Sequence, residues 1–290
     1  MIITKLQGGL GNQMFQYALG RNLAITNKTE VKFDLSFYKK IDGNKTTREY
    51  TLNHFNIIEK IATENEIKKL KKYEQKKGRR NFFHNTFIAD NSIYIKEKQF
   101  NFDENIFKSS TNIYLDGYWQ SKKYFKNIEN IIHKEFILRE EFQIKNEDLK
   151  QNIVSSNSVS LHIRRGDYIN NRKTNEVHGL CSLYYYQKSL EIISKKQNDL
   201  KIFVFSDDIE WAKNNLKTNF PTIFIENNKD CEDLILMSLC KHNIIANSSF
   251  SWWGAWLNQN PDKIVIAPKE WFNDPNKDTT DLIPKSWIRI

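Results

Sequence analysis

The 290-residue chain is predicted to be an α/β protein built on parallel β-sheets. In its second half, short apolar segments alternate with helical segments, the pattern of βαβ units joined by right-handed crossovers. The first half opens with a similar unit, a short strand followed by a glycine-rich loop and a helix. A polar stretch over residues 145–157 separates the two halves. We therefore expect two domains, residues 1–150 and 151–290.

The first domain begins with a strand over Met1–Leu6 and a helix from Met14 towards Asn27. Between them, Gly8–Asn12 is neither a Walker A loop, because no Gly-Lys-Ser/Thr follows, nor a dinucleotide fingerprint, because Met14 stands where that motif needs glycine. The loop is either a ligand-binding turn, with the amides of Asn12 and Gln13 beside it, or a tight turn that needs positive φ. Strands are expected at 31–34 and 113–116, whereas residues 39–112 have no clear order.

The second domain has the more regular pattern. Apolar β-branched and aromatic runs predict its strands, and apolar residues at helical spacing predict the helices between them. The expected strands are 158–163, 201–205, 222–225, 243–246 and 264–266, and the expected helices are 184–195, 209–216, 232–240 and 252–258. The tryptophans of the last helix are assigned to the core.

Composition restricts the class of protein. Hydrophobic residues at 39% and aromatic residues at 13% can form a large core. No apolar stretch of membrane-spanning length and no signal-peptide pattern is visible, so the protein is expected to be cytoplasmic. Cys181, Cys231 and Cys240 are odd in number and form no CxxC pair, which favours reduced thiols over a disulfide or zinc framework.

The net charge is +9, and much of the excess lies in Lys68–Arg80. Ile67, Leu70 and Tyr73 recur every three residues there, so this segment is expected to form a helix with one apolar stripe. Its basic face is either a solvated surface or a peripheral contact with anionic membrane. Nucleic acid ranks lower as a partner and is not expected, because no zinc-finger, RNP or basic-zipper pattern accompanies the charge.

Three polar clusters follow predicted strands: His162–Asp167, Ser206–Asp208 and Asn247–Ser251. The carboxyl ends of parallel strands share one edge of a sheet, so the three loops should meet there. The paired arginines of the first loop suit a phosphate group, and the serines of the third stand at a helix N-terminus, which favours anions. Alone, each cluster reads as a helix cap or a surface ion pair; together they predict a diphosphate site.

Two other segments carry candidate functional side chains. His178 follows a polar stretch long enough to be an active-site loop, and histidine suits proton transfer near neutral pH. Tyr118 and Trp119 follow Asp116 and Gly117 and are expected to contact the face of a sugar ring. No Asp-x-Asp metal motif occurs in the sequence.

These motifs, in this order, resemble those of the bacterial α-1,2-fucosyltransferases, relatives of the animal blood-group H enzymes. The resemblance extends over most of the chain. It rests on Gly8–Ala18, Asp116–Gln120, His162–Tyr168, Phe205–Asp208 and Asn247–Leu257.

The resemblance implies a GT-B-like architecture, in which two Rossmann-like domains face each other across a cleft. It implies transfer of L-fucose from GDP-fucose to the 2-hydroxyl of a terminal β-galactoside, with inversion and with neither metal nor cofactor. The acceptors considered are lactose, N-acetyllactosamine, a β-1,3-linked galactose and a lipid-linked glycan of O-antigen synthesis. The protein is expected in the cytoplasm, either free or at the inner face of the membrane. The alternatives are a fucosyltransferase of another linkage and a glycan-binding protein without catalysis.

The resemblance also assigns roles to residues. Arg164 should contact the β-phosphate with His162 beside it, and Asp207 should face the nucleoside. The donor set is His162, Arg164, Arg165, Asp167, Asp207, Ser248, Ser249, Phe250 and Ser251, and the acceptor set is Gly11, Asn12, Gln13, Asp116, Tyr118 and Trp119. Arg164, His178 and Asn12 are the catalytic candidates. From the chemistry of the side chains, the candidates for the general base are His178 first and Asp116 second, and Asn12 would orient the acceptor hydroxyl.

Overall fold

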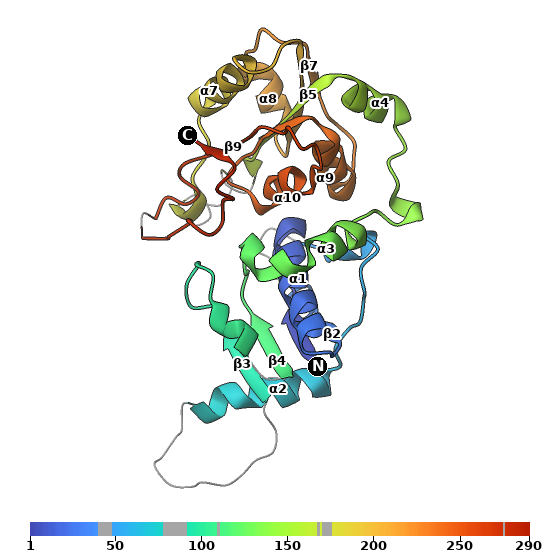
Figure 1. Cartoon of the computed structure of the whole chain (residues 1–290), viewed down its shortest axis with the longest axis vertical. Coiled ribbons are helices and arrows are strands. Elements are labelled where there is room, and N and C mark those ends of the chain that lie inside the picture. The colour runs from blue at the N-terminus through green and yellow to red at the C-terminus, as the bar shows by residue number, and fades with distance from the viewer. Residues whose placement is uncertain (40–47, 78–91, 109–110, 167–168, 170–175, 275) are drawn as a thin grey trace. The chain divides into compact units, whose positions relative to one another are not determined.

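The computed structural model of the chain describes residues 1–39, 48–77, 92–108, 111–166, 169, 176–274 and 276–290. The chain forms two compact α/β units (Figure 1): unit 1 comprises residues 1–137 and 280–282, and unit 2 comprises 138–279 and 283–290. The boundary between these units lies at residues 137/138 and not at the expected residue 150. The polar stretch that suggested residue 150 forms a helix, α4 (Glu147–Ser155), which packs on unit 2. The return of 280–282 to unit 1 was also not foreseen. There, Asp281 accepts hydrogen bonds from Ser121 Oγ and the Phe102 amide.

Unit 1 contains a parallel four-stranded sheet in the order β2-β1-β4-β3 (Figure 1). Its strands are β1 (Ile2–Lys5), β2 (Val31–Asp34), β3 (Ser92–Lys96) and β4 (Asn112–Asp116). Its helices are α1 (Leu10–Thr26), α2 (Glu64–Lys77) and α3 (Glu129–Glu135), with 3-10 turns at Leu52–His54, Glu104–Lys108 and Lys122–Ile128. Three of the strands match expectation, whereas β3 lies in the segment without periodicity.

Helix α1 is buried on nearly every side. Gly20 permits this close approach, because a Cβ there would collide with Thr4 of β1. The buried polar residues of α1 bind loop backbone: Gln16 Nε2 donates to Gly117 O (3.1 Å), and Asn22 Nδ2 donates to Tyr124 O (2.7 Å). The helix therefore holds the loops that follow the strands, in addition to filling the core.

Helix α2 carries the basic segment as far as Lys77, and residues 78–91 lie outside the described part of the chain. Leu70 is buried and Ile67 packs against the same apolar cluster, so the predicted stripe is confirmed at these two positions. Lys71 pairs with the buried carboxylate of Asp34 (3.1 Å), so part of the positive charge serves the fold of unit 1. Within the described segments, no helix has the length and apolarity needed to span a bilayer.

Unit 2 contains a parallel six-stranded sheet in the order β10-β9-β8-β5-β6-β7. The strands are β5 (Asn157–Ile163), β6 (Leu200–Ser206), β7 (Thr222–Phe224), β8 (His242–Ile244), β9 (Val265–Ala267) and β10 (Ile288–Arg289). The helices are α4, α7 (Leu183–Ser194), α8 (Ile209–Asn215), α9 (Asp230–Leu239) and α10 (Ser249–Leu257), with a 3-10 turn at Glu140–Phe142. The alternation predicted from the sequence is confirmed, apart from α4 and β10, which it missed.

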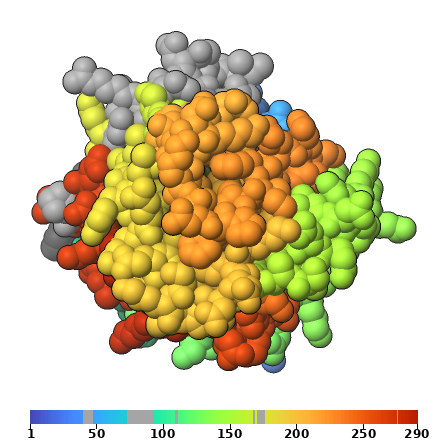
Figure 2. All heavy atoms as spheres, turned by 90° about the horizontal axis from the view of Figure 1, so that it is seen from above, coloured from blue at the N-terminus to red at the C-terminus, as the bar shows by residue number. Residues whose placement is uncertain are grey.

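Side-chain alternation along β5 divides the unit into layers. Leu161 and Ile163 face α7 and α8, which cover one side of the sheet and form much of the surface in Figure 2. Ser160 and His162 face the opposite side, where α9 and α10 pack against each other. Trp252, Trp253 and Trp256 of α10 are buried, as expected.

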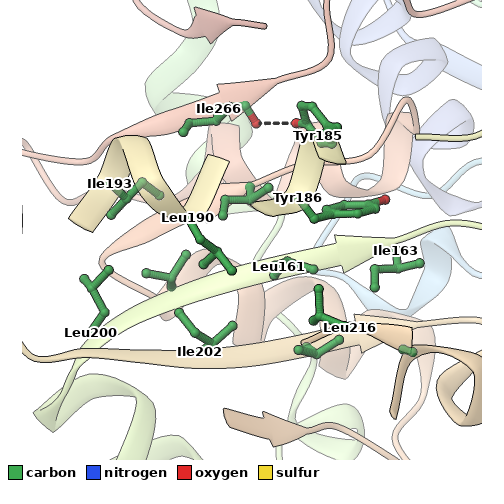
Figure 3. Close-up of a cluster of buried hydrophobic side chains, with 14 residues drawn as sticks. Leu161, Ile163, Tyr185, Tyr186, Leu190, Ile193, Leu200, Ile202, Leu216 and Ile266 are labelled. Atoms are coloured by element: carbon green, nitrogen blue, oxygen red, sulfur yellow. Dashed lines mark hydrogen bonds between the residues drawn. The ribbon is translucent and has the colours of Figure 1, made fainter. Parts of the chain in front are cut away.

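In the core between α7 and the sheet, Tyr185 of α7 reaches the sheet backbone with its hydroxyl group (Figure 3). The hydroxyl of Tyr185 donates to Ile245 O (2.7 Å) and contacts Ile266 O (3.2 Å). Ile245 directly follows β8, and Ile266 lies within the neighbouring strand β9. Tyr185 therefore binds α7 to the sheet by both packing and hydrogen bonding.

We expect Tyr185→Phe to lower the free energy of unfolding of unit 2 by about 1–3 kcal/mol, because it removes the donor that serves two buried carbonyls. The measurement is urea denaturation followed by tryptophan fluorescence. The adjacent Tyr184 is 71% exposed, and Tyr184→Phe should change stability by less than about 0.5 kcal/mol. Equal losses in both variants would contradict this account.

Candidate active site

The three polar loops of unit 2 follow strands that are neighbours in the sheet, β8, β5 and β6. All strands are parallel, so Arg164, Asp207 and Ser248 lie at the same carboxyl edge. The predicted convergence of the loops is confirmed. Asp167 lies outside the described residues.

The carboxylate of Asp207 organises the turn after β5. Its Oδ1 accepts a hydrogen bond from the Arg165 amide (2.8 Å), and its Oδ2 accepts one from the Gly166 amide (2.9 Å). The same Oδ2 lies 3.2 Å from Nε of Arg164. A Cβ at Gly166 would stand 2.7 Å from Oδ2, so the turn requires glycine for close approach. The described geometry thus shows Asp207 holding Arg164, whereas its expected contact with a nucleoside stays a prediction.

The two arginines of this turn have different partners. The guanidinium of Arg165 lies over the ring of Trp211 with its carbon 3.5 Å from the ring centroid, and its Nε is 3.3 Å from a carboxylate oxygen of Asp208. Stacking and ion pairing together bind the turn to α8. These contacts give Arg165 a structural role, and its expected place in the donor set stays a prediction.

His162 lies at the end of β5, 3% exposed, with its ring centroid 5.6 Å from that of Phe250 in α10. Burial, with a smaller contribution from the Arg164 guanidinium, lowers the pKa of His162 to about 3. The imidazole is therefore neutral at physiological pH, and it adds no positive charge and cannot act as a general acid there. Its Nδ1 has no hydrogen-bond partner among the described residues, and a buried polar atom in this state is explained by a bound water or ion, by strain or by a catalytic role.

The serines at the start of α10 divide into two groups. Ser248 caps the helix, accepting a hydrogen bond from the Phe250 amide, and the partly exposed Ser249 follows it. Ser251 is buried, and its hydroxyl donates to Ser248 O (3.3 Å). Ser251 was expected in the donor set, but its hydroxyl is turned into the helix. The N-terminus of α10 at Ser249 and Phe250 is partly exposed and is the part of this loop suited to bind an anion.

Asn247 connects the third loop to the segment with His178. Its Nδ2 donates to His178 O (2.7 Å) and approaches Gly179 O. Gly179 has a φ of +67°, and a Cβ there would collide with Asn273. The imidazole of His178 lies 5.3 Å from the ring of Phe272. This network places the His178 backbone at the same edge as the phosphate candidates.

In unit 1, the loop after β1 is also built around side-chain amides. Gln13 is fully buried; its Nε2 donates to Glu49 O (2.8 Å), and its Oε1 accepts from the Thr51 and Leu52 amides. Asn12 Oδ1 accepts from Gln120 Nε2 (2.7 Å). Gln13 thus has a structural role, in contrast to its expected contact with acceptor, whereas Asn12 and the adjacent Gly11 stand at the start of α1 on the carboxyl edge.

The turn after β4 departs from expectation at two residues. Asp116 pairs with Lys5 (2.9 Å) and accepts a hydrogen bond from the Tyr94 hydroxyl (2.7 Å), so both of its carboxylate oxygens are engaged within unit 1. Trp119 was expected to contact the face of a sugar ring. Its side chain is 2% exposed, so the ring belongs to the core instead. Tyr118, 41% exposed, retains the expected role.

Two carboxylates that the sequence did not single out occupy the same edges. Glu97 follows β3 and accepts hydrogen bonds from the turn after β4. Asp233 lies in the first turn of α9, beyond β7, where burial raises its pKa to about 7, assisted by Asp230 and Glu232 and opposed by a hydrogen bond from Asn228. The sequence signal that could have identified both carboxylates is their position after a strand. Glu97 was missed because β3 lies in a segment without periodicity. Asp233 was missed because it is one of several acidic residues at the start of a helix.

The described residues contain no group of three or more His, Cys, Asp or Glu side chains with metal-site geometry. The expected metal independence of the reaction stays a prediction.

Residues 1–290 match the profile of Glycosyl transferase family 11. The chain belongs to this family. The Escherichia coli O-antigen biosynthesis glycosyltransferase WbnK is 37% identical over 305 residues, covering 98% of this chain and 99% of WbnK. An Escherichia coli α-1,2-colitosyltransferase is also 37% identical, over 100% and 99% of the two chains. The mouse galactoside α-(1,2)-fucosyltransferase 2 is 27% identical over 52% of this family 11 chain and 46% of its own length.

Solved structures show the same fold at low identity. NodZ α-1,6-fucosyltransferase co-crystallised with GDP matches with a TM-score of 0.51 and 13% identity, over 87% of this chain and 90% of NodZ. POFUT1 in complex with GDP matches with a TM-score of 0.50 and 14% identity, over 92% and 97% of the two chains. The predicted α/β fold of GT-B type is confirmed.

Asp233 generates a prediction about stability. Its pKa is raised from the model-peptide value of 3.8 to about 7, so the folded state binds this proton more tightly than the unfolded state. Stability is therefore lost as the pH rises from about 4 to 7. We expect Asp233→Asn, which keeps an acceptor for Asn228, to be more stable than the parent at pH 8 by on the order of 2–4 kcal/mol, with little gain at pH 4.

The measurement is the melting temperature of both proteins between pH 4 and pH 9. Asp230→Asn removes the same charge from an exposed position of the same helix turn and serves as the control. A gain for Asp233→Asn that did not vary with pH would contradict the proposed titration.

Proposed function

We propose that this family 11 enzyme transfers L-fucose, or a close analogue, from its GDP derivative to the 2-hydroxyl of a terminal β-galactoside during synthesis of O-antigen or another cell-surface glycan. One observation carries the donor assignment: Asp207 orients the Arg164 guanidinium at the sheet edge that also carries the N-terminus of α10. A cation and helix amides at one edge suit a diphosphate. The O-antigen role of WbnK and the GDP bound to NodZ and POFUT1 support the proposal.

In this mechanism, the acceptor hydroxyl attacks the anomeric carbon, the bond to GDP breaks with inversion, and negative charge grows on the β-phosphate. Arg164 and the amides at the start of α10 stabilise that charge without a metal ion or a cofactor. The neutral His162 beside Arg164 contributes a hydrogen bond, not a charge. Because Asp116 is paired with Lys5, His178 is the preferred general base, and Asn12 orients the acceptor.

A second donor is favoured by a specific observation, namely the identity of 37% to an α-1,2-colitosyltransferase. Colitose is L-fucose without its 3-hydroxyl, so a site that hydrogen-bonds this hydroxyl would reject the analogue, and a site that packs against C3 would prefer it. A fucosyltransferase of another linkage and a glycan-binding protein without catalysis remain the alternatives.

The deciding experiment measures GDP release from GDP-fucose and from GDP-colitose, with EDTA present, with and without lactose, followed by NMR linkage analysis of the product. Lactose-dependent release with the new sugar on galactose O2 supports donor, linkage and metal independence together. A product of another linkage would overturn the regiochemistry. Affinity for glycans without affinity for GDP would favour the non-catalytic alternative.

Arg164→Ala is expected to lower kcat about 100-fold or more, because the developing phosphate charge loses its nearest cation. Circular dichroism and the melting temperature should show a folded protein. Arg289→Ala, which removes an exposed guanidinium bonded to Lys269 O, is the matched control and should retain kcat. Near-normal turnover by Arg164→Ala would contradict its role.

A peripheral contact between Lys68–Arg80 and anionic membrane, with the protein at the inner face of the cytoplasmic membrane, is part of the same proposal. A lipid-linked acceptor would make such a contact useful. Sedimentation with vesicles containing phosphatidylglycerol, compared with phosphatidylcholine vesicles, tests it; binding should weaken as salt is raised.

A further inference from the structure

Glu97 stands just beyond β3 and binds the turn after the neighbouring strand β4. Its Oε2 accepts a hydrogen bond from the Tyr118 amide (2.7 Å), and its Oε1 accepts one from the Trp119 amide (3.0 Å). The Glu97 amide in turn donates to Asp116 O (2.9 Å). One side chain therefore binds two successive amides of the segment that begins at Asp116.

The turn that Glu97 binds has an unusual backbone. Trp119 has a φ of +57°, a left-handed conformation that costs about 1 kcal/mol or more for a residue other than glycine. Gly117 is in close contact with Glu97, whose Cβ and carboxylate occupy the place where a side chain of residue 117 would lie. This conformation buries the Trp119 ring and leaves the adjacent Tyr118 exposed. The hydrogen bonds to Glu97 hold the backbone that separates these two rings.

The arrangement repeats that of unit 2. There, Asp207 follows one strand and accepts hydrogen bonds from two successive amides, those of Arg165 and Gly166, after the neighbouring strand. In both units a glycine of the bound turn has no room for a Cβ beside the carboxylate. The turn held by Asp207 presents a residue, Arg164, that the proposed function assigns to the donor.

The electrostatic setting of Glu97 differs from that of an ordinary structural carboxylate. Across the described segments, no Lys, Arg or His nitrogen lies within ion-pair distance of Glu97, whereas Asp116 nearby is paired with Lys5. Burial raises the pKa of Glu97, and its two amide hydrogen bonds oppose this effect. A partly buried carboxylate without a cation is costly, and the amides of the turn are what compensate it.

We propose that Glu97 is the positioning residue of the acceptor subsite, holding the Gly117–Trp119 turn so that Tyr118 presents its ring to the galactoside. The assignment rests on the proposed function, because it takes the ligand of Tyr118 to be the acceptor sugar. Glu97 acts through Tyr118 and takes no part in donor binding.

Glu97→Gln tests this assignment, because the amide group of glutamine replaces one acceptor oxygen with a donor that faces a backbone N–H. We expect the KM for lactose to rise about ten-fold, the cost of one hydrogen bond to a charged group, with the Kd for GDP within two-fold of the parent value. Glu97→Asp shortens the side chain, so its carboxylate can bind only one of the two amides but places no donor against the other. We expect a smaller increase in the KM for lactose, and this variant replaces Glu97→Gln if Glu97→Gln does not fold.

Two further variants separate positioning from general stabilisation. Tyr118→Ala should also raise the KM for lactose, and the double variant Glu97→Gln/Tyr118→Ala should resemble Tyr118→Ala alone, since Glu97 acts through Tyr118. Glu135 is the matched control in unit 1, where both its oxygens are bonded, to Arg21 and to the Tyr17 hydroxyl. Glu135→Gln should lower the melting temperature without changing the KM for lactose.

An unchanged KM for lactose in Glu97→Gln, or additive effects in the double variant, would overturn the assignment. If the parent enzyme transferred sugar to no galactoside, the proposed function would fail separately. Hydrogen exchange at the Tyr118 and Trp119 amides would then decide whether Glu97 holds the turn: faster exchange in Glu97→Gln supports the positioning, and unchanged exchange overturns it.

Discussion

The interaction on which the donor edge depends is the acceptance of two successive backbone N–H groups by the carboxylate of Asp207. The loop after β5 carries adjacent arginines that repel each other, and nothing in its local sequence selects one conformation. Binding both amides fixes the turn, and the remaining interaction with Nε orients Arg164. Arg165 is bound on the other side by Trp211 and Asp208, so only one of the two cations is directed by Asp207.

This arrangement is possible because neighbouring parallel strands end together. A carboxylate placed one residue after β6 is within reach of the amides after β5, and Glu97 stands in the same relation to β3 and β4. The hydrogen bonds compensate the desolvation of each carboxylate and restrict a loop that would otherwise sample many conformations. The turns after β5 and β4, which carry predicted ligand-binding residues, are thus ordered by the carboxylates of Asp207 and Glu97. These carboxylates need not contact a ligand themselves.

The buried polar residues of helix α1 serve a similar purpose in unit 1. Gln13 and Gln16 bind the backbone of three separate loops, so α1 acts as a scaffold for the carboxyl edge and not only as core. The adjacent amides of Asn12 and Gln13, which the sequence suggested as ligand-binding groups, therefore differ in role. Gln13 binds backbone within unit 1, whereas Asn12 lies at the start of α1.

The sequence alone determined the parallel α/β fold, most strands of both sheets, the convergence of three loops in unit 2, and the family, because these follow from local periodicity and from motifs of contiguous residues. Tertiary structure decided what each polar group does. The burial of Trp119 and Ser251, the pairing of Asp116 with Lys5, the division of roles between Arg164 and Arg165, and the involvement of Glu97 all depend on contacts between residues far apart in the chain. The same holds for the domain boundary, since α4 joins unit 2 by packing. A residue type shows which interactions a side chain can make, and only the neighbours supplied by the fold select among them.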